Sequence, residues 1–392
     1  MANADNRGKA AGQPAVGLIV AGGGVMGLWT AFLAARQGLS VHLAERRAIG
    51  AGASGGVLGA LMPHLPDRWN AKKAFQFSAL VSLEAEIAAL EAETGLSAGY
   101  RRTGRLIPLP KPHNRAIALR HAQDALSVWT MPGRTFAFEV LDASPVAGWP
   151  AETAMASGLV HDHLAARLAP RALLAALRAA LARLPNVTIR EGAGLSALDP
   201  ASGIARFEDG ASLAFGHCVL AAGVETFALL APLVPPLARP VGSAVKGQAA
   251  LLRAPVDPAL PVIFADGLYI VPHEDGLVAI GSTSENSFAD PSGTDGLLDA
   301  LIARARQMAP VLAEAPVVER WAGLRPKAIG REPMVGRHPD HPTVSLMTGG
   351  FKVSFGLAHE LARAVLDEIK GGTLGVPPSF TVAAHFEEAG RV

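Results

Sequence analysis

An uncharged stretch near the start of the chain, residues 10–35, limits what this sequence can fold into. It follows Lys9 and contains Gly22-Gly23-Gly24-Val25-Met26-Gly27 in its middle. These glycines would weaken a membrane-spanning helix or the core of a signal peptide, so export or anchoring is the less favoured alternative and we expect a cytoplasmic protein. The pattern predicts a buried strand over 16–21 and a helix over 25–36, after a disordered lead-in at residues 1–13.

The glycines match the pattern G-x-G-x-x-G between a strand and a helix, which is typical of dinucleotide binding. Gly22 allows the tight turn, Gly24 lets a pyrophosphate approach the backbone, and Gly27 lets the helix pack on the sheet. A second strand over 40–44 ends at Glu45, whose carboxylate can accept hydrogen bonds from both hydroxyls of an adenosine ribose. We expect three neighbours to contact the dinucleotide as well: Val25, Met26 and Arg46.

A second loop of small residues, 50–56, follows this strand and is too rich in glycine for an ordinary connection. Such a loop can cover the pyrophosphate and the ribityl chain of a long, extended cofactor, which favours FAD over NAD. Its candidate cofactor contacts are Ala53, Ser54 and Gly55.

Here the sequence begins to resemble the glycine oxidase and D-amino-acid oxidase family of FAD enzymes, which pairs the first fingerprint with a G-x-G-A-S-G loop. The resemblance extends from about residue 18 to 370 and continues, in the family's order, through Val245-Lys246-Gly247-Gln248, Tyr269-Ile270-Val271-Pro272, Ile280-Gly281-Ser282-Thr283, Trp321-Ala322-Gly323-Leu324-Arg325-Pro326 and Gly349-Gly350-Phe351-Lys352.

The order of the predicted elements indicates an α/β protein, α+β overall. We expect a Rossmann-type FAD-binding domain with a parallel sheet, interleaved with a substrate domain whose sheet is mainly antiparallel. The predicted FAD-binding segments are 14–85, 150–235 and 320–375, and the substrate segments are 86–149 and 236–319.

Further elements follow from periodicity and from turn residues. Helices are predicted over 72–93, from Pro170 to Pro185, and over 356–369, and a hairpin over 204–215 turns at Asp209-Gly210. A buried strand over 219–223 ends in Ala222 and Gly223, which we expect at the cofactor. The resemblance places the last helix with its N-terminus toward the flavin, near the backbone of Gly349, Gly350, Phe351 and Lys352.

The resemblance implies oxidation of an amine or α-amino acid, with a hydride passing from the α-carbon to flavin N5. A guanidinium that grips both oxygens of a carboxylate would fix such a substrate well, and Arg325 matches the family's carboxylate-binding arginine. Tyr269 matches the substrate-facing tyrosine. The alternatives are a structural ion pair for Arg325 and a core position for Tyr269.

Two departures from the family argue against glycine itself as the substrate. Lys352 stands where arginine is common, which retains the charge and loses the fork geometry. Gly267 stands where related enzymes can carry a larger polar residue, so we expect a roomier pocket.

Covalent flavin attachment and metal binding are not expected. The single cysteine, Cys218, lies in a predicted strand as a small buried residue, and no histidine lies in a recognisable attachment motif, although a histidine link stays open. His161 and His163 have a spacing compatible with metal binding, but the sequence shows no further ligands nearby.

The overall charge gives no pull toward nucleic acid, since 35 Lys and Arg face 34 Asp and Glu. Residues 94–123, however, contain no acid and six basic residues: Arg101, Arg102, Arg105, Lys111, Arg115 and Arg120. This segment favours a solvated basic face and leaves RNA binding open.

The RNA alternative has a specific form. The chain is also similar to the FAD domain of the bacterial enzyme that finishes tRNA wobble methylaminomethyl-uridine, through Gly59-Ala60-Leu61-Met62-Pro63. That reading implies oxidative removal of a carboxymethyl group from a wobble-uridine side chain. A non-catalytic flavin protein is a third option, against which Arg325 and Tyr269 argue. The electron acceptor is oxygen or another oxidant.

Overall fold

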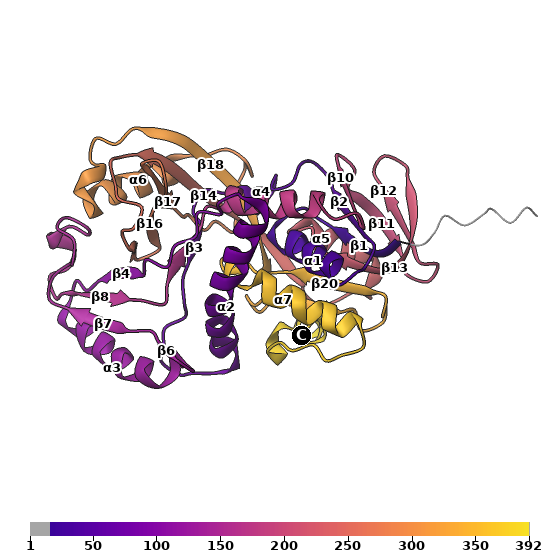
Figure 1. Ribbon diagram of the computed structural model, residues 1–392, viewed down its shortest axis with the longest axis horizontal. Coiled ribbons are helices and arrows are strands. Elements are labelled where there is room, and N and C mark those ends of the chain that lie inside the picture. Colours follow the sequence, from indigo (N-terminus) through magenta and orange to yellow (C-terminus); the bar gives the residue numbers. More distant parts are fainter. Residues whose placement is uncertain (1–15, 392) are drawn as a thin grey trace, which may run out of the picture.

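Two β-sheets form the framework of the computed structural model, which describes residues 16–391 (Figure 1). The first sheet lies in one half of the molecule and the second in the other, with the long helix α2 (Ala71–Thr94) between them. The predicted lead-in at 1–13 and the beginning of the segment 14–85 lie outside the described residues.

The first sheet is the predicted parallel sheet of a dinucleotide-binding domain. Strands β10, β2, β1, β13 and β20 are parallel neighbours in that order, and β19 closes the edge in antiparallel pairing with β20. The first half of β13 also pairs in antiparallel fashion with β12, its partner in a hairpin. β11 pairs with the other edge of β12. The strands are β1 (Val16–Ala21), β2 (Val41–Glu45), β10 (Val187–Glu191), β11 (Leu195–Asp199), β12 (Ile204–Phe207), β13 (Ser212–Leu220), β19 (Met334–Arg337) and β20 (Val344–Thr348).

The predicted strand–turn–helix is present with the expected bounds, because its glycines leave the backbone little choice. β1 ends at Ala21, and α1 (Val25–Arg36) begins three residues after Gly22. Gly22 has a φ of +113°, and a Cβ there would overlap with the backbone of Ala221. The turn can therefore form only with glycine at this position.

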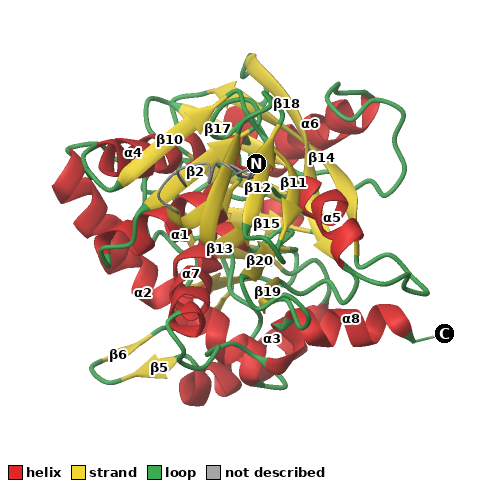
Figure 2. Ribbon diagram, turned by 90° about the vertical axis from the view of Figure 1, so that its right-hand side faces the viewer, coloured by secondary structure: helices red, strands yellow, loops and turns green. Residues whose placement is uncertain are grey.

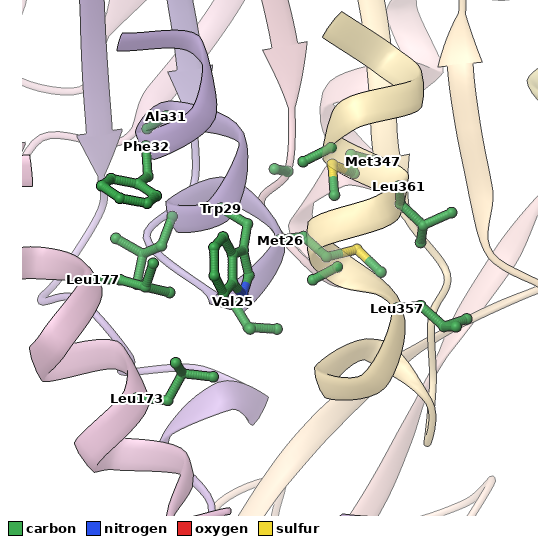
Figure 3. Close-up of a cluster of buried hydrophobic side chains, with 14 of the residues drawn as sticks. Val25, Met26, Trp29, Ala31, Phe32, Leu173, Leu177, Met347, Leu357 and Leu361 are labelled. Atoms are coloured by element: carbon green, nitrogen blue, oxygen red, sulfur yellow. The ribbon is translucent and has the colours of Figure 1, made fainter. Parts of the chain in front are cut away.

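Apolar side chains cover both faces of the first sheet. On one face, α1 packs between α4 (Pro170–Ala182) and α7 (Ser354–Ile369). Figure 3 shows Phe32 beside Leu177 on the α4 side of α1, and Met26 on the α7 side. On the other face, a second cluster lies against the hairpin: Ile19, Ala21, Phe207, Phe215 and Leu220.

This burial of both faces of the sheet explains why residues 16–35 carry no charge.

Seen from the side, α2, α4 and α7 lie near one another on one flank of the molecule (Figure 2). Within residues 16–391, no helix has both the length and the apolar character needed to span a membrane.

The second sheet has eight strands in the order β18-β14-β17-β16-β15-β4-β8-β7 and is antiparallel except where β15 meets β4. Its strands are β4 (Arg105–Pro108), β7 (Phe138–Leu141), β8 (Leu159–Asp162), β14 (Gly242–Arg253), β15 (Val262–Ala265), β16 (Leu268–Pro272), β17 (Leu277–Gly281) and β18 (Val317–Ala328). A mainly antiparallel substrate sheet was expected.

The remaining elements are helices at the periphery and short strand pairs. The helices are α3 (Pro112–Val128), α5 (Glu225–Leu230), α6 (Gly296–Met308) and α8 (Val382–Gly390). The short strands are β3 (Ala60–Leu61), which pairs with β9 (Ala166–Arg167), and β5 (Thr130–Met131), which pairs with β6 (Arg134–Thr135).

Two strands lie in the second sheet although all residues of β8 and most residues of β18 fall in segments predicted for the FAD-binding domain. β8 is paired with β4 and β7, and β18 is paired along its length with β14. The division into domains stays a prediction. Strand pairing favours moving the first boundary beyond Asp162 and the last one beyond Ala328.

Candidate functional site

A cavity of about 640 Å³ runs from the N-terminus of α1 to the second sheet and is lined by residues of both halves of the molecule. Fourteen of the predicted site residues line it: Gly22, Gly24, Val25, Met26, Glu45, Arg46, Ala53, Ser54, Ala222, Gly223, Tyr269, Arg325, Phe351 and Lys352. Segments that are far apart in the sequence therefore meet at one site.

Four of the predicted cofactor residues are glycines that do not line the cavity and instead allow close packing of the chain: Gly27, Gly55, Gly349 and Gly350. A Cβ at Gly27 would overlap with the carbonyl oxygen of Gly22, and one at Gly55 with the carbonyl oxygen of Gly50. Gly349 has a φ of +74°, and Gly350 leaves room for the side chains of Met26 and Ser354. The packing role predicted for Gly27 from the sequence agrees with its position, and cofactor contact by these four glycines stays a prediction.

The N-terminus of α1 meets the second glycine-rich loop at Ser54. The hydroxyl Oγ of Ser54 accepts a hydrogen bond from the Val25 N–H (3.0 Å), and a Cβ at Gly24 would lie 3.1 Å from the same oxygen. The first N–H groups of a helix have no acceptor within it and attract anions. Bare backbone around a helix N-terminus fits the pyrophosphate of a dinucleotide.

Glu45 stands at the end of β2 with its carboxylate already oriented. Its Oε2 accepts from the Gly23 N–H (2.7 Å) and its Oε1 from the Arg47 N–H (3.0 Å). Arg46 lies beside it and forms ion pairs with Glu208 (2.8 Å) and Glu225 (3.0 Å). This end of the cavity has the acid that a ribose requires, as the sequence predicts.

The far wall of the cofactor end is made by the ends of β13 and β20. Gly223 has a φ of +61°, and its carbonyl oxygen accepts a hydrogen bond from the Thr348 hydroxyl (2.8 Å). Phe351, with a φ of +43°, donates its N–H to the Pro326 carbonyl (3.1 Å). The turn before α7 is thereby held against β18 of the other sheet.

The Arg325 guanidinium lines the cavity from β18 of the second sheet. Its Nη1 donates to the Thr283 carbonyl (3.1 Å), and within residues 16–391 no carboxylate lies within ion-pair distance of it. Burial lowers the pKa of Arg325 to about 10, while the nearby Tyr269 and Glu285 act to raise it. The alternative of a structural ion pair is therefore not what the structure contains.

Tyr269 and Lys352 line the same cavity as Arg325. The Tyr269 ring lies 4.7 Å from that of Phe264, centroid to centroid, and burial raises the pKa of its hydroxyl. The Lys352 ammonium lies 5.6 Å from the centroid of the Phe351 ring. Burial and then the charge of Arg325 lower the pKa of Lys352. The three predicted substrate residues share one pocket.

Gly267 does not enlarge the cavity, contrary to the expectation from sequence. It lies exposed at the turn between β15 and β16, with a φ of +77°, and does not line the cavity. Its small size serves the turn.

The other candidate groups lie outside the cavity. Cys218 is buried in β13, where burial raises the pKa of its thiol to about 12. His161 and His163 do have a third possible ligand, which the sequence did not show: Glu139 on the neighbouring strand, 3.0 Å from the His163 Nε2. That hydrogen bond explains why Glu139 lies close to the two histidines without a metal ion between them. The absence of a bound metal stays a prediction.

The basic segment 94–123 is not a free positive face. Four of its six charges form ion pairs with acids from elsewhere in the chain: Arg101 with Glu274, Arg102 with Glu84, Arg105 with Asp162 and Arg115 with Asp142. The local excess of charge in the sequence is largely neutralised by the fold.

The cavity residues that the sequence-based prediction missed include Arg105 and His64, which carry ionisable groups. Arg105 is only 4% exposed and lines the cavity from β4. His64 lines it from the segment after β3, and burial with the charge of Lys72 lowers the pKa of its imidazole to about 4. In the sequence Arg105 is one charge of the basic segment 94–123, and nothing local to it indicates that it is buried at the cavity.

The residues present fit FAD: a helix N-terminus with a glycine cradle for the pyrophosphate, an oriented acid for the ribose, and a continuous cavity that leads on to Arg325.

Comparison with known proteins agrees with this fit. The family model described as FAD dependent oxidoreductase, DAO, matches residues 18–364. Glycine oxidase from Pseudomonas putida is 31% identical over 379 residues, covering 92% of this chain and 96% of that protein. Glycine oxidase from Pseudomonas aeruginosa is 30% identical, covering 96% of this chain and 99% of that protein.

Solved structures share the fold. Glycine oxidase from Geobacillus kaustophilus superposes with a TM-score of 0.80 at 22% identity, over 93% of this chain and 97% of that one. Iminodiacetate oxidase from Chelativorans sp. BNC1 gives a TM-score of 0.79 at 21% identity, over 93% and 98%. Because the family model covers most of the chain and the relatives match it from end to end, this protein belongs to the DAO family of FAD dependent oxidoreductases.

Proposed function

We propose that this enzyme oxidises the C–N bond of a small α-amino acid or amine, with a hydride leaving the α-carbon and an imine that hydrolyses in water. The observation that carries the proposal is the guanidinium of Arg325, which lines the cavity without a carboxylate partner. A planar cation held in place by a backbone carbonyl is suited to grip the carboxylate of a substrate. FAD, when bound non-covalently, supplies the acceptor for two electrons.

The chain's own residues would bind and orient the substrate. Arg325 fixes the carboxylate, and the Tyr269 hydroxyl, whose pKa is raised by burial, stays protonated and donates a second hydrogen bond. Lys352 adds a positive charge beside Arg325. Two cations near the amine disfavour its ammonium form, so they favour the neutral amine that hydride loss requires.

A small-molecule substrate is supported over tRNA. Arg101, Arg102 and Arg115 of the basic segment are engaged in ion pairs, which leaves few charges for phosphates. The relatives named glycine oxidase support an amino-acid substrate. Oxidative removal of a carboxymethyl group from a wobble uridine is the alternative that the test below includes.

The test is anaerobic mixing of the purified yellow protein with a panel of amines, followed at the flavin absorbance. Glycine, sarcosine, other secondary amines and both enantiomers of common amino acids are compared with carboxymethylaminomethyl-modified tRNA. Bleaching by one class of amino acid supports the proposal, whereas bleaching by the tRNA alone overturns it. Reoxidation in air, compared with reoxidation by an artificial acceptor, distinguishes an oxidase from a dehydrogenase.

The role of Arg325 is tested separately by Arg325→Ala. We expect a KM for the best amino acid at least about a hundredfold higher, from the loss of a charged bidentate contact, with FAD still bound. Unchanged kinetics would remove Arg325 from the substrate site.

A further inference from the structure

A second buried arginine lines the substrate end of the cavity. Arg105 on β4 is 4% exposed, and its Nε donates to the Asp162 Oδ2 (2.5 Å). Asp162 is fully buried, and its Oδ1 accepts from the Ala165 N–H (2.8 Å). The carboxylate thus holds the guanidinium in one orientation and neutralises its charge.

This ion pair uses one edge of the guanidinium and leaves the other edge without a partner. Among the described residues, the Nε of Arg105 alone makes a hydrogen bond, and its Nη2 is buried without an acceptor. A buried N–H group without an acceptor is unfavourable, and native proteins nearly always satisfy such groups. The Nη1 of Arg105 has no hydrogen bond to a described residue either and is not fully covered, so it is the nitrogen that a ligand in the cavity can reach. A purely structural ion pair explains the Nε contact and leaves the Nη edge unexplained.

Arg105 and Arg325 line the same cavity from two different strands of the second sheet. In the sequence of strands β18-β14-β17-β16-β15-β4, Arg325 lies on the first, Arg105 on the last and Tyr269 on β16 between them. The positive charges of both arginines act to lower the pKa of the Tyr269 hydroxyl, against the larger effect of burial. Both guanidiniums are therefore within electrostatic reach of the same phenol.

The lining of this end of the cavity is cationic. It contains Arg105, Arg325 and Lys352, and the carboxylates that line the cavity within residues 16–391 are Glu45 and Glu225. Both acids lie at the cofactor end, where Glu45 ends β2 and Glu225 is paired with Arg46. Asp162 lies behind Arg105 and the charge of Glu285 acts on Arg325, but neither acid lines the cavity, so its lining at this end is cationic.

We propose that the preferred substrate is an amino acid with two carboxylates, the α-carboxylate bound by Arg325 and the second bound by the Nη edge of Arg105. The second carboxylate sits either on the nitrogen substituent, as in iminodiacetate, or on the side chain, as in aspartate and glutamate. The inference rests on the proposed amino-acid oxidation and narrows its substrate class.

The experiment compares each diacid with the amide in which its second carboxylate is uncharged. The quantity compared is the rate constant of anaerobic flavin reduction divided by the Kd of the substrate for the holoenzyme. The pairs are iminodiacetate and its monoamide, aspartate and asparagine, and glutamate and glutamine, with both enantiomers of the last two. In at least one pair we expect the diacid to be favoured about tenfold or more, as for one added hydrogen bond to a charged group. If no pair favours the diacid while glycine or sarcosine bleaches the flavin, this inference fails and the proposed function stands. If no amine bleaches the flavin, the proposed function itself fails.

The double variant Arg105→Gln/Asp162→Asn assigns the preference to this pair without burying a lone charge. We expect the ratio of diacid to amide to fall below about twofold. The matched control, Arg115→Gln/Asp142→Asn, removes an ion pair of the same segment that does not line the cavity, and should keep the wild-type ratio.

A retained preference in the Arg105 and Asp162 double variant, with normal FAD content, would overturn the assignment. If that variant does not fold, Arg105→Lys keeps the charge opposite Asp162 and removes the second edge. It must lower the same ratio, and an unchanged ratio overturns the inference equally.

Discussion

The guanidinium of Arg325 lies flat against the backbone of Gly247 on the neighbouring strand. β14 and β18 pair over their full length, with Val245 opposite Arg325 and Gly247 opposite Gly323. A Cβ at Gly247 would overlap with the Cζ and both Nη atoms of Arg325. The glycine of the Val245-Lys246-Gly247-Gln248 segment therefore provides the space in which the arginine lies.

Gly247→Ala should displace Arg325 and weaken substrate binding without loss of cofactor. Because the added methyl occupies the position of the guanidinium, we expect KM for a carboxylate substrate to rise about tenfold or more. The check is steady-state kinetics together with the FAD content of the purified variant. Gly296→Ala is the matched control, because Gly296 is the first residue of α6 and a Cβ there meets nothing within 4 Å. Unaltered KM in Gly247→Ala would show that Arg325 is not fixed by this contact.

Carboxylate binding should weaken in alkaline solution. Arg325 has a pKa lowered to about 10 by burial, and the pKa of Lys352 is lowered as well. A cation binds a carboxylate while it is protonated, so binding is complete below the lowered pKa and is lost as the pH rises through it. We expect the Kd of an unreactive carboxylate such as acetate to be constant from about pH 7 to 8.5 and to rise between about pH 9 and 11.

Perturbation of the flavin absorbance by acetate measures this Kd. Lys352→Met removes one of the two titrating cations, so the rise that remains belongs to Arg325. A Kd that stays flat to pH 11 in the wild-type protein would contradict the lowered pKa of both groups.

Ser54→Ala should reduce the affinity for FAD. The Ser54 hydroxyl accepts the Val25 N–H at the start of α1 and joins the two glycine-rich loops (3.0 Å). Loss of a hydroxyl that accepts from a helix N-terminus costs about 0.5–2 kcal/mol of stability, and if this whole cost falls on the FAD-bound form, the Kd for FAD rises about 2- to 30-fold. Titration of the apoprotein with FAD, followed by quenching of FAD fluorescence, gives this value. Ser97→Ala, far from the cavity, should leave it unchanged.

Gln248→Leu should increase the mobility of residues 285–295, a segment that contributes to the lining of the cavity. The buried Gln248 amide donates to Glu285 (3.0 Å) and to Asp295 (2.9 Å), and accepts from the Asp295 N–H (2.9 Å). One side chain thus holds both ends of residues 285–295, which include cavity-lining Pro291 and Ser292. We expect faster hydrogen exchange and proteolytic cleavage in this segment, with a raised KM.

The exposed Gln307 on α6 offers the comparison, since Gln307→Leu removes an amide that clamps nothing. Equal exchange rates in 285–295 for both variants would refute the clamp.

Sequence alone predicted the cofactor half well because its signals are local. The bounds of β1 and α1 followed from the glycine turn, and α2 and α4 followed from apolar periodicity with Pro170 at a helix start. The hairpin expected over 204–215 was also found, and β13 continues from it into the strand expected over 219–223 but ends at Leu220.

The substrate half was harder to predict because its structure depends on contacts between residues that are far apart in the sequence. α3 and α6 were not predicted, and the long strands β14 and β18 contain glycines that weaken a strand pattern but serve Arg325. Arg105 appeared in the sequence as one charge of a basic segment. Its burial depends on Asp162, 57 residues away, and no local pattern shows that pairing.

The parallel sheet also sets the order in which this protein can be completed. Its central strand β13 lies between β1, formed by the first residues described, and β20, formed by residues 344–348 of a chain of 392. At about 5–20 residues per second, a ribosome needs roughly 17–70 s to reach the end of β20, and pairing strands so distant in sequence is slow in itself. The glycine fingerprint is synthesised more than 300 residues before Met347 and Thr348, which line the same cavity, so the cofactor site cannot close until β20 has been made.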